Sequence, residues 1–314
     1  MRVREFVLLL AFGVSTGCAT VAGKDPGLAH PGSDSVLAAG EKQGPFGRTY
    51  RLFVPSAARG SGELRPLVIA LHGGVATARI FAEQSGFSQV AEENDFFVLY
   101  PNGIGVFSAF RHWNAGWCCA TAAKNGVDDV GYVARVLERV ASAWPVDRDR
   151  VFVVGYSNGG MLAHKIALDW GPERLAGLAV FAGPVGPLGT QSEPAVAPTP
   201  TLIIHGTADD RLSVDGSLPD RRGNELLGAR GSAQFWATRN GCETPSTATD
   251  GGAAWSRETW CAGANTRVRL DLLDDWGHDW PGPKFAAARQ QKDLAEYDAA
   301  TEIARFFRLA DPAP

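Results

Sequence analysis

The sequence has little excess of either charge, since Lys and Arg total 30 against 34 for Asp and Glu, a formal net charge of −4. Nucleic-acid binding depends on basic surfaces, so this composition argues against a nucleic-acid partner. Long apolar runs are also scarce, and the single one near the N-terminus excludes a multi-span membrane protein. Only five cysteines are present, and their spacings do not match paired zinc knuckles. The length of 314 residues and the hydrophobic fraction of 45% indicate an ordinary globular chain of one large or two small domains.

Residues 1–18 have the pattern of a secretory signal, with Arg2 and Arg4 before the apolar run Phe6–Val14. The segment ending at Cys18 resembles a bacterial lipobox, although Ser15 stands where leucine is usual. Two alternatives stay open: a lipid anchor on Cys18, which would be the chain's contact with a membrane, or a plain signal with an incidental cysteine. Residues 19–44 are rich in small and polar residues without periodicity, which predicts a flexible tether. The predicted location is therefore secreted, periplasmic or cell-envelope.

Export implies an oxidising compartment, and without Cys18 an even set of four cysteines remains. Cys242 and Cys261 flank a polar segment rich in Gly and Thr, so a loop-closing disulfide is the preferred pairing. The adjacent Cys118 and Cys119 could bond to each other, cross-pair or stay reduced. Four cysteines allow three connectivities, and the sequence does not choose among them.

From Arg48 onward, strand patterns alternate with helix patterns without a second linker, which predicts a single catalytic domain over residues 45–314. The expected strands are 48–54, 67–71, 96–99, 151–154, 178–181, 202–204 and 267–273, and the expected helices are 130–144, a segment from 158 onward, 229–239 and 294–307. This alternation indicates an α/β fold with a mostly parallel sheet between two helical layers. Residues 182–201 are too short for a helical cap domain. Ligands are then expected at the carboxyl ends of the strands.

Gly155-Tyr156-Ser157-Asn158-Gly159 is a GxSxG motif between an apolar strand and an amphipathic helix. At such an elbow the serine backbone is strained and the chain runs close to its neighbours, so glycines are needed beside it. The hydroxyl of Ser157 then projects above the sheet at the start of a helix, whose dipole favours developing negative charge. Ser157 is therefore the predicted nucleophile.

A serine hydroxyl needs a base to take its proton and a carboxylate to orient that base. Of six histidines, His278 follows the last strand, the position of the base in folds with this motif. Asp209 and Asp210 both follow the 202–204 strand and compete for the role of the acid. Other acids lie close to the base in sequence and are interpreted as a solvated strand edge: Asp271, Asp274 and Asp275.

An oxyanion hole requires two backbone N–H donors, and the residues that supply them are predicted to be Asn158 and Gly74. Asn158 directly follows the nucleophile, and Gly74 belongs to the His-Gly-Gly loop after a buried strand. Trp113 and Trp280 are predicted as opposite walls that contact the substrate, with core packing as the alternative. Asp128 and Asp129 open a helix, so capping is their expected role.

Six motifs occur in one order: LHGG, WNAGWCC, VDDVGYV, GYSNGGM, HGTAD and GHDWPG. With them the chain resembles the polyhydroxybutyrate depolymerase and feruloyl esterase family of secreted α/β-hydrolases, from Tyr50 to Phe307. The resemblance implies a triad of Ser157, Asp209 in the HGTAD position and His278 in the GHxWPG position, with no cofactor or metal. The sequence departs from many relatives at LHGG and at Trp276-Gly277, which touches the lining of the site and not the triad.

The predicted function is hydrolysis of carboxylic esters through an acyl-enzyme on Ser157. An uncapped site fits esters on large molecules, either polyhydroxyalkanoate-type oligoesters or feruloyl and acetyl esters of polysaccharides. A serine peptidase of the same fold is one alternative, and a catalytically silent binding protein that keeps the fold is another. The oligomeric state is left open.

Overall fold

The computed structural model describes residues 33–38, 48–58, 60–105, 110–186, 198–217, 226–242, 245–261, 267–282 and 297–310. The expected signal segment, Cys18 and most of the expected tether lie outside these residues. Within them, no helix has the length and apolar character needed to cross a membrane.

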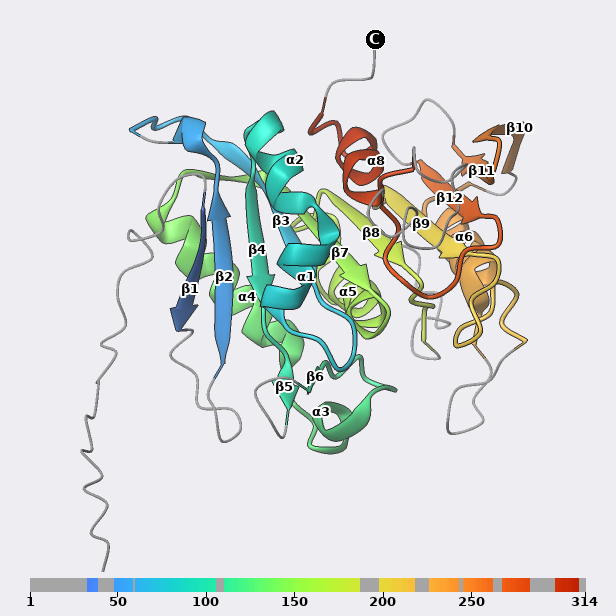
Figure 1. Ribbon diagram of the computed structural model, residues 1–314, viewed down its shortest axis with the longest axis horizontal. Coiled ribbons are helices and arrows are strands. Elements are labelled where there is room, and N and C mark those ends of the chain that lie inside the picture. The colour runs from blue at the N-terminus through green and yellow to red at the C-terminus, as the bar shows by residue number, and fades with distance from the viewer. Residues whose placement is uncertain are drawn as a thin grey trace, which may run out of the picture.

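The described chain is built on a ten-stranded sheet with the order β1-β2-β4-β3-β7-β8-β9-β12-β11-β10 (Figure 1). The strands from β4 to β12 in this order pair in parallel, whereas the two outermost strands at each edge are antiparallel. Their bounds are β1 Ser33–Ala38, β2 Thr49–Val54, β3 Arg65–Leu71, β4 Phe97–Pro101, β7 Val146–Tyr156, β8 Gly177–Phe181, β9 Thr201–Gly206, β10 Pro245–Gly252, β11 Trp255–Trp260 and β12 Val268–Leu273. Two short strands, β5 Ile104–Gly105 and β6 Arg111–His112, form a separate ribbon beyond the end of β4.

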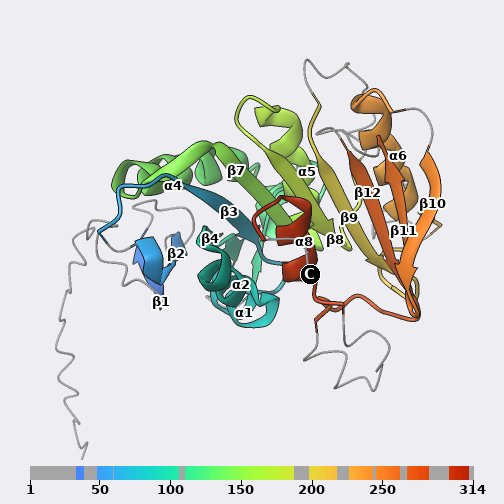
Figure 2. The same cartoon turned by 90° about the horizontal axis from the view of Figure 1, so that it is seen from above.

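Helices cover both faces of the sheet, as the view from above shows (Figure 2). One face carries α4 Asp129–Ala143, α5 Asn158–Trp170 and α6 Gly228–Arg239, and the other carries α1 Ala78–Ser85, α2 Phe87–Asn94 and α8 Ala299–Phe306. A 3₁₀ turn, Ser56–Ala58, follows β2, and a short α3, Ala120–Lys124, follows β6. Thr77, Asp128 and Asp298 cap α1, α4 and α8 by accepting backbone N–H groups of the first turn. Asp128 thus has the predicted capping role.

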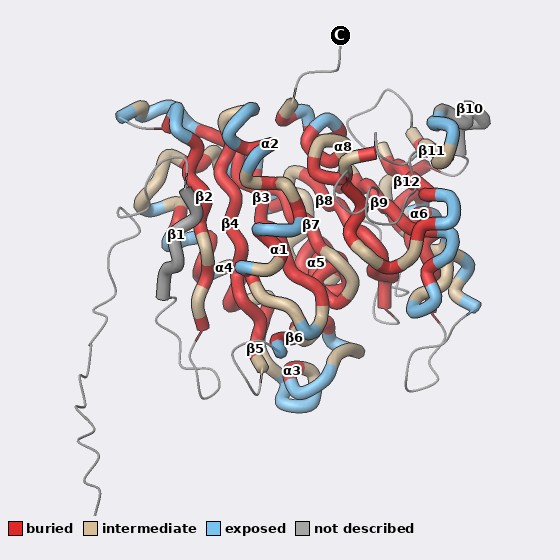
Figure 3. The backbone as a smooth tube through the Cα atoms, viewed as in Figure 1, coloured by how far each residue is buried: buried red, intermediate tan, exposed pale blue. Residues whose placement is uncertain are grey.

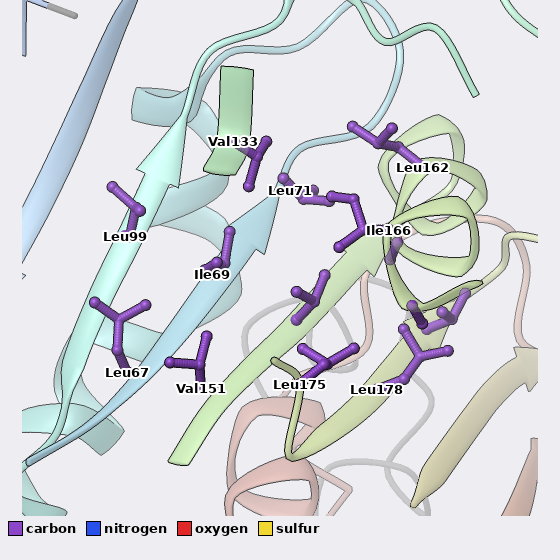
Figure 4. Close-up of a cluster of buried hydrophobic side chains, with 14 of the residues drawn as sticks. Leu67, Ile69, Leu71, Leu99, Val133, Val151, Leu162, Ile166, Leu175 and Leu178 are labelled. Carbon is purple, nitrogen blue, oxygen red and sulfur yellow. The ribbon is translucent and has the colours of Figure 1, made fainter. Parts of the chain in front are cut away.

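Each face of the sheet packs a hydrophobic core of its own, because side chains alternate along a strand. Ile69 and Leu71 of β3 face the α4–α5 side and pack with Val133 and Leu162, whereas Val68 faces the α1–α2–α8 side (Figure 4). The central strands are accordingly buried along most of their length, apart from the exposed positions 148–150 early in β7, while other exposed positions lie mainly on the outer surfaces of the helices (Figure 3). This double burial explains why the central strands are continuous apolar runs. The fold is the α/β-hydrolase architecture, and the described residues between β8 and β9 contain no helix.

The structure adds α1, α2, α3, β5 and β6 to the elements expected from the sequence, and it corrects three of the expectations. Part of the expected tether, Ser33–Ala38, pairs antiparallel with β2 and is therefore a strand. The polar segment between Cys242 and Cys261, expected as a loop, contains the β10–β11 hairpin that extends the sheet. All three strands, β1, β10 and β11, are antiparallel additions at the edges of the sheet, where polar residues are tolerated, so they lack the apolar runs that identify the central strands.

Asp271 is the third correction, because its side chain is fully buried on β12 and not solvated. It accepts hydrogen bonds from Arg257, Arg269 and Tyr297, and Glu302 on α8 binds the same two arginines. Burial alone would raise the pKa of Asp271, but the two guanidinium groups outweigh burial and lower it. Asp271 therefore ties β12 to β11 and α8, whereas Asp274 and Asp275 are exposed as expected.

The four described cysteines form two disulfides. Cys242, just after α6, bonds to Cys261 at the end of β11, as predicted, with their Cα atoms 5.6 Å apart. Cys118 bonds to its neighbour Cys119, one of the alternatives left open, across a cis peptide bond in the segment that connects β6 to α3. The first bridge closes the base of the β10–β11 hairpin.

Candidate active site

Ser157 lies in a tight turn at the junction of β7 and α5. Its backbone has φ 52° and ψ −119°, a left-handed conformation that is strained for a residue with a side chain. A side chain on Gly159 would overlap the carbonyl oxygens of Leu71 and His72, and one on Gly155 would overlap the Gly159 carbonyl. The two glycines thus allow the turn to pack against β3, and the turn presents the Ser157 hydroxyl at the carboxyl end of the sheet.

Three side chains from distant parts of the chain meet at this turn. His278 Nε2 lies 2.9 Å from Ser157 Oγ, and His278 Nδ1 lies 2.7 Å from Asp209 Oδ2. An ionised carboxylate only accepts hydrogen bonds, so Nδ1 carries the ring proton and Nε2 is left to accept from the serine hydroxyl. Asp210, the competing acid, is exposed on the neighbouring position. The geometry brings Ser157, His278 and Asp209 together and leaves Asp210 out.

Asp209 is held as an anion by its surroundings. Its side chain is fully buried, and burial raises the pKa of a carboxyl. His278 opposes this effect through its hydrogen bond and its charge. The backbone N–H groups of Arg211 and Leu212 also donate to Asp209 Oδ1, at 2.9 and 3.0 Å. Together these interactions outweigh burial and lower the pKa of Asp209. His205 also approaches Asp209 Oδ2, at 3.4 Å, while its own Nε2 donates to the Leu212 carbonyl. His205 thus lies directly behind the acid, a position that sequence analysis does not predict.

The loop that contains Gly74 lies directly beside the start of α5. A Cβ built on Gly73 would lie 3.5 Å from Ser157 Cβ, and one on Gly74 would lie 3.7 Å from Asn158 Cβ. The Asn158 N–H belongs to the first turn of α5, where backbone donors have no partner within the helix. Gly74 and Asn158, the two predicted oxyanion donors, are therefore neighbours at the nucleophile. Gly74 also leaves room for the ring of His112, which would lie 3.3 Å from such a Cβ.

The side chain of Asn158 has a second task that sequence reasoning did not anticipate. Its Oδ1 accepts the backbone N–H of Trp113 at 2.7 Å, and its Nδ2 donates to the Trp113 carbonyl at 3.1 Å. Trp113 in turn donates its Nε1 hydrogen to the His72 carbonyl at 2.8 Å, and Val75 donates its N–H to the Arg111 carbonyl at 2.8 Å. The segment around β6 thus ties the Gly74 loop to the first residue of α5.

The predicted tryptophan walls differ from what the structure shows. Trp113 is 0% exposed and Trp280 is 2% exposed, so neither indole reaches a bound substrate in this conformation. Trp280 packs edge-on against the rings of Phe81 and Phe181, inside the second core. The flanking glycines predict that both tryptophans lie in loops, but they do not predict that these loops fold inward. Indoles are large enough to fill a core. Core packing, the alternative, describes both residues.

Two partly exposed side chains, Tyr156 and His112, lie beside the residues of this site. Tyr156, next to the nucleophile, lies with its ring 5.6 Å from that of His278. His112 is partly exposed beside Gly74. Tyr156 is the first of the two variable residues of the GxSxG motif, so its position next to Ser157 is the signal available in the sequence.

His72 and His164 are buried and are not bases for this chemistry. His72 Nδ1 donates to the Gly73 carbonyl and its Nε2 accepts from the Gly103 N–H. His164 accepts from Trp236 Nε1 at 3.0 Å and donates to the Gly183 carbonyl at 3.0 Å. Burial lowers the pKa of His72 to about 3 and that of His164 to about 4, so both rings are neutral near pH 7.

This burial predicts an acid-sensitive contribution to stability. The unfolded chain binds a proton at His164 near pH 6.5 but the folded chain binds it only near pH 4, so stability falls as pH drops from 6.5 toward 4. We expect the wild type to lose about 2 kcal/mol more unfolding free energy between pH 7 and pH 5 than His164→Gln, whose amide keeps a donor and an acceptor without titrating. Denaturant unfolding of both proteins at both pH values measures the difference, and equal losses would contradict the assignment.

Within the described ranges, no cluster of His, Cys, Asp and Glu side chains could hold a metal ion. The fold, the strained serine turn and the adjacent histidine together define an α/β-hydrolase. Comparison with known proteins gives the family: residues 48–213 match the model of the esterase PHB depolymerase family, and the chain belongs to it.

Relatives of known designation are esterases. The chain is 28% identical over 255 residues to NocK of Nocardia uniformis subsp. tsuyamanensis, which is designated an esterase, covering 76% of this chain and 72% of NocK. It is 27% identical over 225 residues to feruloyl esterase B of Piromyces equi, covering 68% of this chain and 39% of that protein. An acetyl xylan esterase from Aspergillus awamori has a similar structure, with a TM-score of 0.61 and 17% sequence identity. The match covers 88% of this chain and 100% of that esterase. The protein is thus a carboxylic-ester hydrolase, and it spans well under half of the feruloyl esterase it matches.

Proposed function

We propose that the protein is an exported serine esterase whose catalytic triad is Ser157, His278 and Asp209. One observation carries the proposal: hydrogen bonds run without a gap from Ser157 Oγ through both ring nitrogens of His278 to a buried carboxylate. Such a relay makes a serine hydroxyl nucleophilic near neutral pH. The two disulfides support an oxidising destination for the chain.

In the first half of the reaction, Ser157 Oγ attacks the ester carbonyl carbon while His278 Nε2 takes the hydroxyl proton. The carbonyl oxygen becomes negative and accepts hydrogen bonds from the Gly74 and Asn158 N–H groups. When the tetrahedral intermediate collapses, the bond to the alcohol breaks and His278 returns the proton to the departing oxygen. Asp209 stays ionised and stabilises the imidazolium that forms in between.

In the second half, water attacks the acyl group on Ser157 while His278 takes one of its protons. The second tetrahedral intermediate uses the same two N–H donors, and its collapse breaks the bond to Ser157 Oγ, which recovers its proton from His278. The carboxylic acid is released and the residues return to their starting state. His278 Nε2 takes and returns the proton in every transfer, and no transfer needs a cofactor.

The proposed substrates are esters carried on large molecules, either polyhydroxyalkanoate-type oligoesters or feruloyl and acetyl esters of polysaccharides. The names of the relatives, which include feruloyl and acetylxylan esterases, support the second class. A panel of p-nitrophenyl butyrate, methyl ferulate and an aminoacyl anilide tests the reaction type. We expect the wild type to hydrolyse the esters and leave the anilide intact, whereas preference for the anilide would identify a serine peptidase instead.

A further inference from the structure

The two oxyanion donors come from different elements of the fold. Gly74 belongs to the loop that follows β3, and Asn158 is the first residue of α5. A backbone donor stabilises a negative oxygen most strongly when it is aligned before the charge develops. The position of the loop relative to α5 therefore matters for the reaction.

A third segment, residues 111–114, joins the loop to the helix. Toward the loop, Trp113 Nε1 donates to the His72 carbonyl at 2.8 Å, and a carbonyl of β6 accepts the Val75 N–H at 2.8 Å. Toward α5, the Trp113 N–H and carbonyl bond to the Asn158 amide at 2.7 and 3.1 Å. The segment thus has hydrogen bonds to both elements that carry an oxyanion donor.

The side chain of Asn158 is directed at this segment and not at a substrate. Its amide has an acceptor oxygen and a donor nitrogen, and they pair with the N–H and the carbonyl of one residue, Trp113, as a neighbouring strand would. Asn158 is 4% exposed, so its amide does not reach a bound ester in this conformation. We call these two hydrogen bonds the Asn158 clamp.

The far end of the segment is held by a buried ion pair. Asp129 Oδ2 accepts the Asn114 N–H at 2.6 Å, and Asp129 Oδ1 accepts from Arg48 Nη2 at 2.6 Å. The side chains of Arg48 and Asp129 are both 0% exposed. Arg48 also donates to the Asn102 carbonyl at 3.1 Å, and its guanidinium lies 3.4 Å from the centre of the Tyr132 ring. The carboxylate is therefore a fixed acceptor.

Asp129 does not have the capping role that sequence analysis predicts, and its burial calls for another explanation. A buried ion pair stabilises a fold little compared with well-packed apolar residues of the same volume. What the carboxylate does provide is a rigid partner for Asn114, one residue beyond the clamp on Trp113. Residues 113 and 114 are consequently held from two sides, by α5 and by α4.

We propose that the Asn158 side chain is a positioning residue, which aligns the Gly74 and Asn158 N–H groups with each other through the segment 111–114, and that Asp129 anchors this segment. The inference rests on the proposed function, because it concerns the oxyanion of that reaction. The negative oxygen exists in the transition state and not in the bound ester, so a misaligned pair of donors lowers kcat and leaves KM nearly unchanged.

Asn158→Ala tests the clamp, because alanine keeps the backbone N–H and favours the helix. We expect kcat for p-nitrophenyl butyrate to fall about 30-fold with KM within about a factor of two, a smaller loss than removal of an oxyanion donor causes. Steady-state kinetics at a temperature well below the unfolding midpoint measure both constants.

An alkyl trifluoromethyl ketone gives a second readout that a loss of stability would not produce. Its carbonyl carbon bonds to Ser157 Oγ, the hydroxyl proton passes to His278, and the ketone oxygen becomes an anion at the two donors. The inhibition constant should therefore rise in Asn158→Ala by about the factor by which kcat/KM falls.

The matched control is Asn240→Ala, which removes a clamp of the same kind outside the site. Asn240 Oδ1 accepts the Thr199 N–H at 3.1 Å, and Asn240 Nδ2 donates to the Thr199 carbonyl at 2.8 Å. Thr199 precedes β9, at the end of the strand opposite to the site. We expect this variant to keep the kcat and the ketone inhibition constant of the wild type.

Two substitutions of Asp129 separate its hydrogen bond from its charge. Asparagine keeps an oxygen that can accept the Asn114 N–H, whereas alanine does not, and both remove the charge opposite Arg48. We expect Asp129→Ala to lower kcat about tenfold with KM little changed, and Asp129→Asn to recover most of that loss.

Three results would overturn the positioning role: an unchanged kcat in folded Asn158→Ala, an equal loss of kcat in Asn240→Ala, or a fall in kcat without weaker binding of the ketone. Should the Asp129 variants fail to fold, the comparison of Asn158→Ala with Asn240→Ala decides alone. Labelling of wild-type Ser157 by a fluorophosphonate reports separately on the proposed function, which stands even if the clamp proves unimportant.

Discussion

Ser157→Ala is expected to abolish ester hydrolysis. The substitution removes the atom that forms the acyl-enzyme, so neither half of the reaction has a covalent path, and residual turnover reflects only binding and the oxyanion donors. We expect kcat for p-nitrophenyl butyrate to fall by a factor on the order of 10⁵ or more. Steady-state assays at high enzyme concentration, with the uncatalysed rate subtracted, measure this fall.

The fold of this variant should be unaffected, because the Ser157 backbone N–H, which donates to the Phe181 carbonyl at 2.9 Å, is retained. Removing the hydroxyl deletes one hydrogen bond to a histidine that stays bonded to Asp209. Thermal unfolding should therefore give a midpoint within a few degrees of the wild type. Substantial activity in a folded Ser157→Ala protein would exclude this serine as the nucleophile.

Asp209→Asn is expected to give the second large loss. The amide cannot hold His278 in the tautomer with its proton on Nδ1, so Nε2 no longer accepts the Ser157 proton, and the positive ring of the transition state loses its counter-charge. A fall in kcat on the order of 10³ to 10⁴ is expected near neutral pH.

Asp210→Asn is the matched control, because it makes the same chemical change one residue further on, at an exposed side chain. We expect it to keep kcat within about a factor of three, since an exposed surface change away from the site costs little. The ratio of the two kcat values is the informative quantity. A larger loss in Asp210→Asn than in Asp209→Asn would reassign the acid and require the loop after β9 to adopt another conformation.

The sequence was sufficient to predict the central sheet and the residues that meet at Ser157. Strands such as Arg65–Leu71 and Thr201–Gly206 are buried on both faces, so they appear as apolar runs that few other structures produce. The elbow is equally recognisable, because the backbone strain at Ser157 forces glycines at fixed positions around it. Parallel strands place their carboxyl ends at one edge of the sheet, which is why the sequence predicts that residues as distant as Ser157 and His278 meet.

The sequence does not predict which side chains in loops are buried. Trp113 and Trp280 occupy segments rich in glycine and polar residues, and only tertiary packing turns both indoles inward. The prediction for Asp271 is wrong for a related reason, since its partners Arg257 and Tyr297 come from elements whose proximity depends on the β10–β11 hairpin and α8. Pairings between distant side chains carry no local sequence signal. The predictions for these residues are therefore wrong, whereas those for the central strands are confirmed.

The central claim, an activated hydroxyl at Ser157, is tested most directly by intact-mass measurement after exposure to a fluorophosphonate probe. The account predicts that the wild type gains the mass of one phosphonyl group, that peptide mapping places it on Ser157, and that Ser157→Ala gains nothing under the same conditions. A wild-type protein that stays unlabelled while it hydrolyses esters, or a Ser157→Ala variant that is labelled as fast as the wild type, would contradict it.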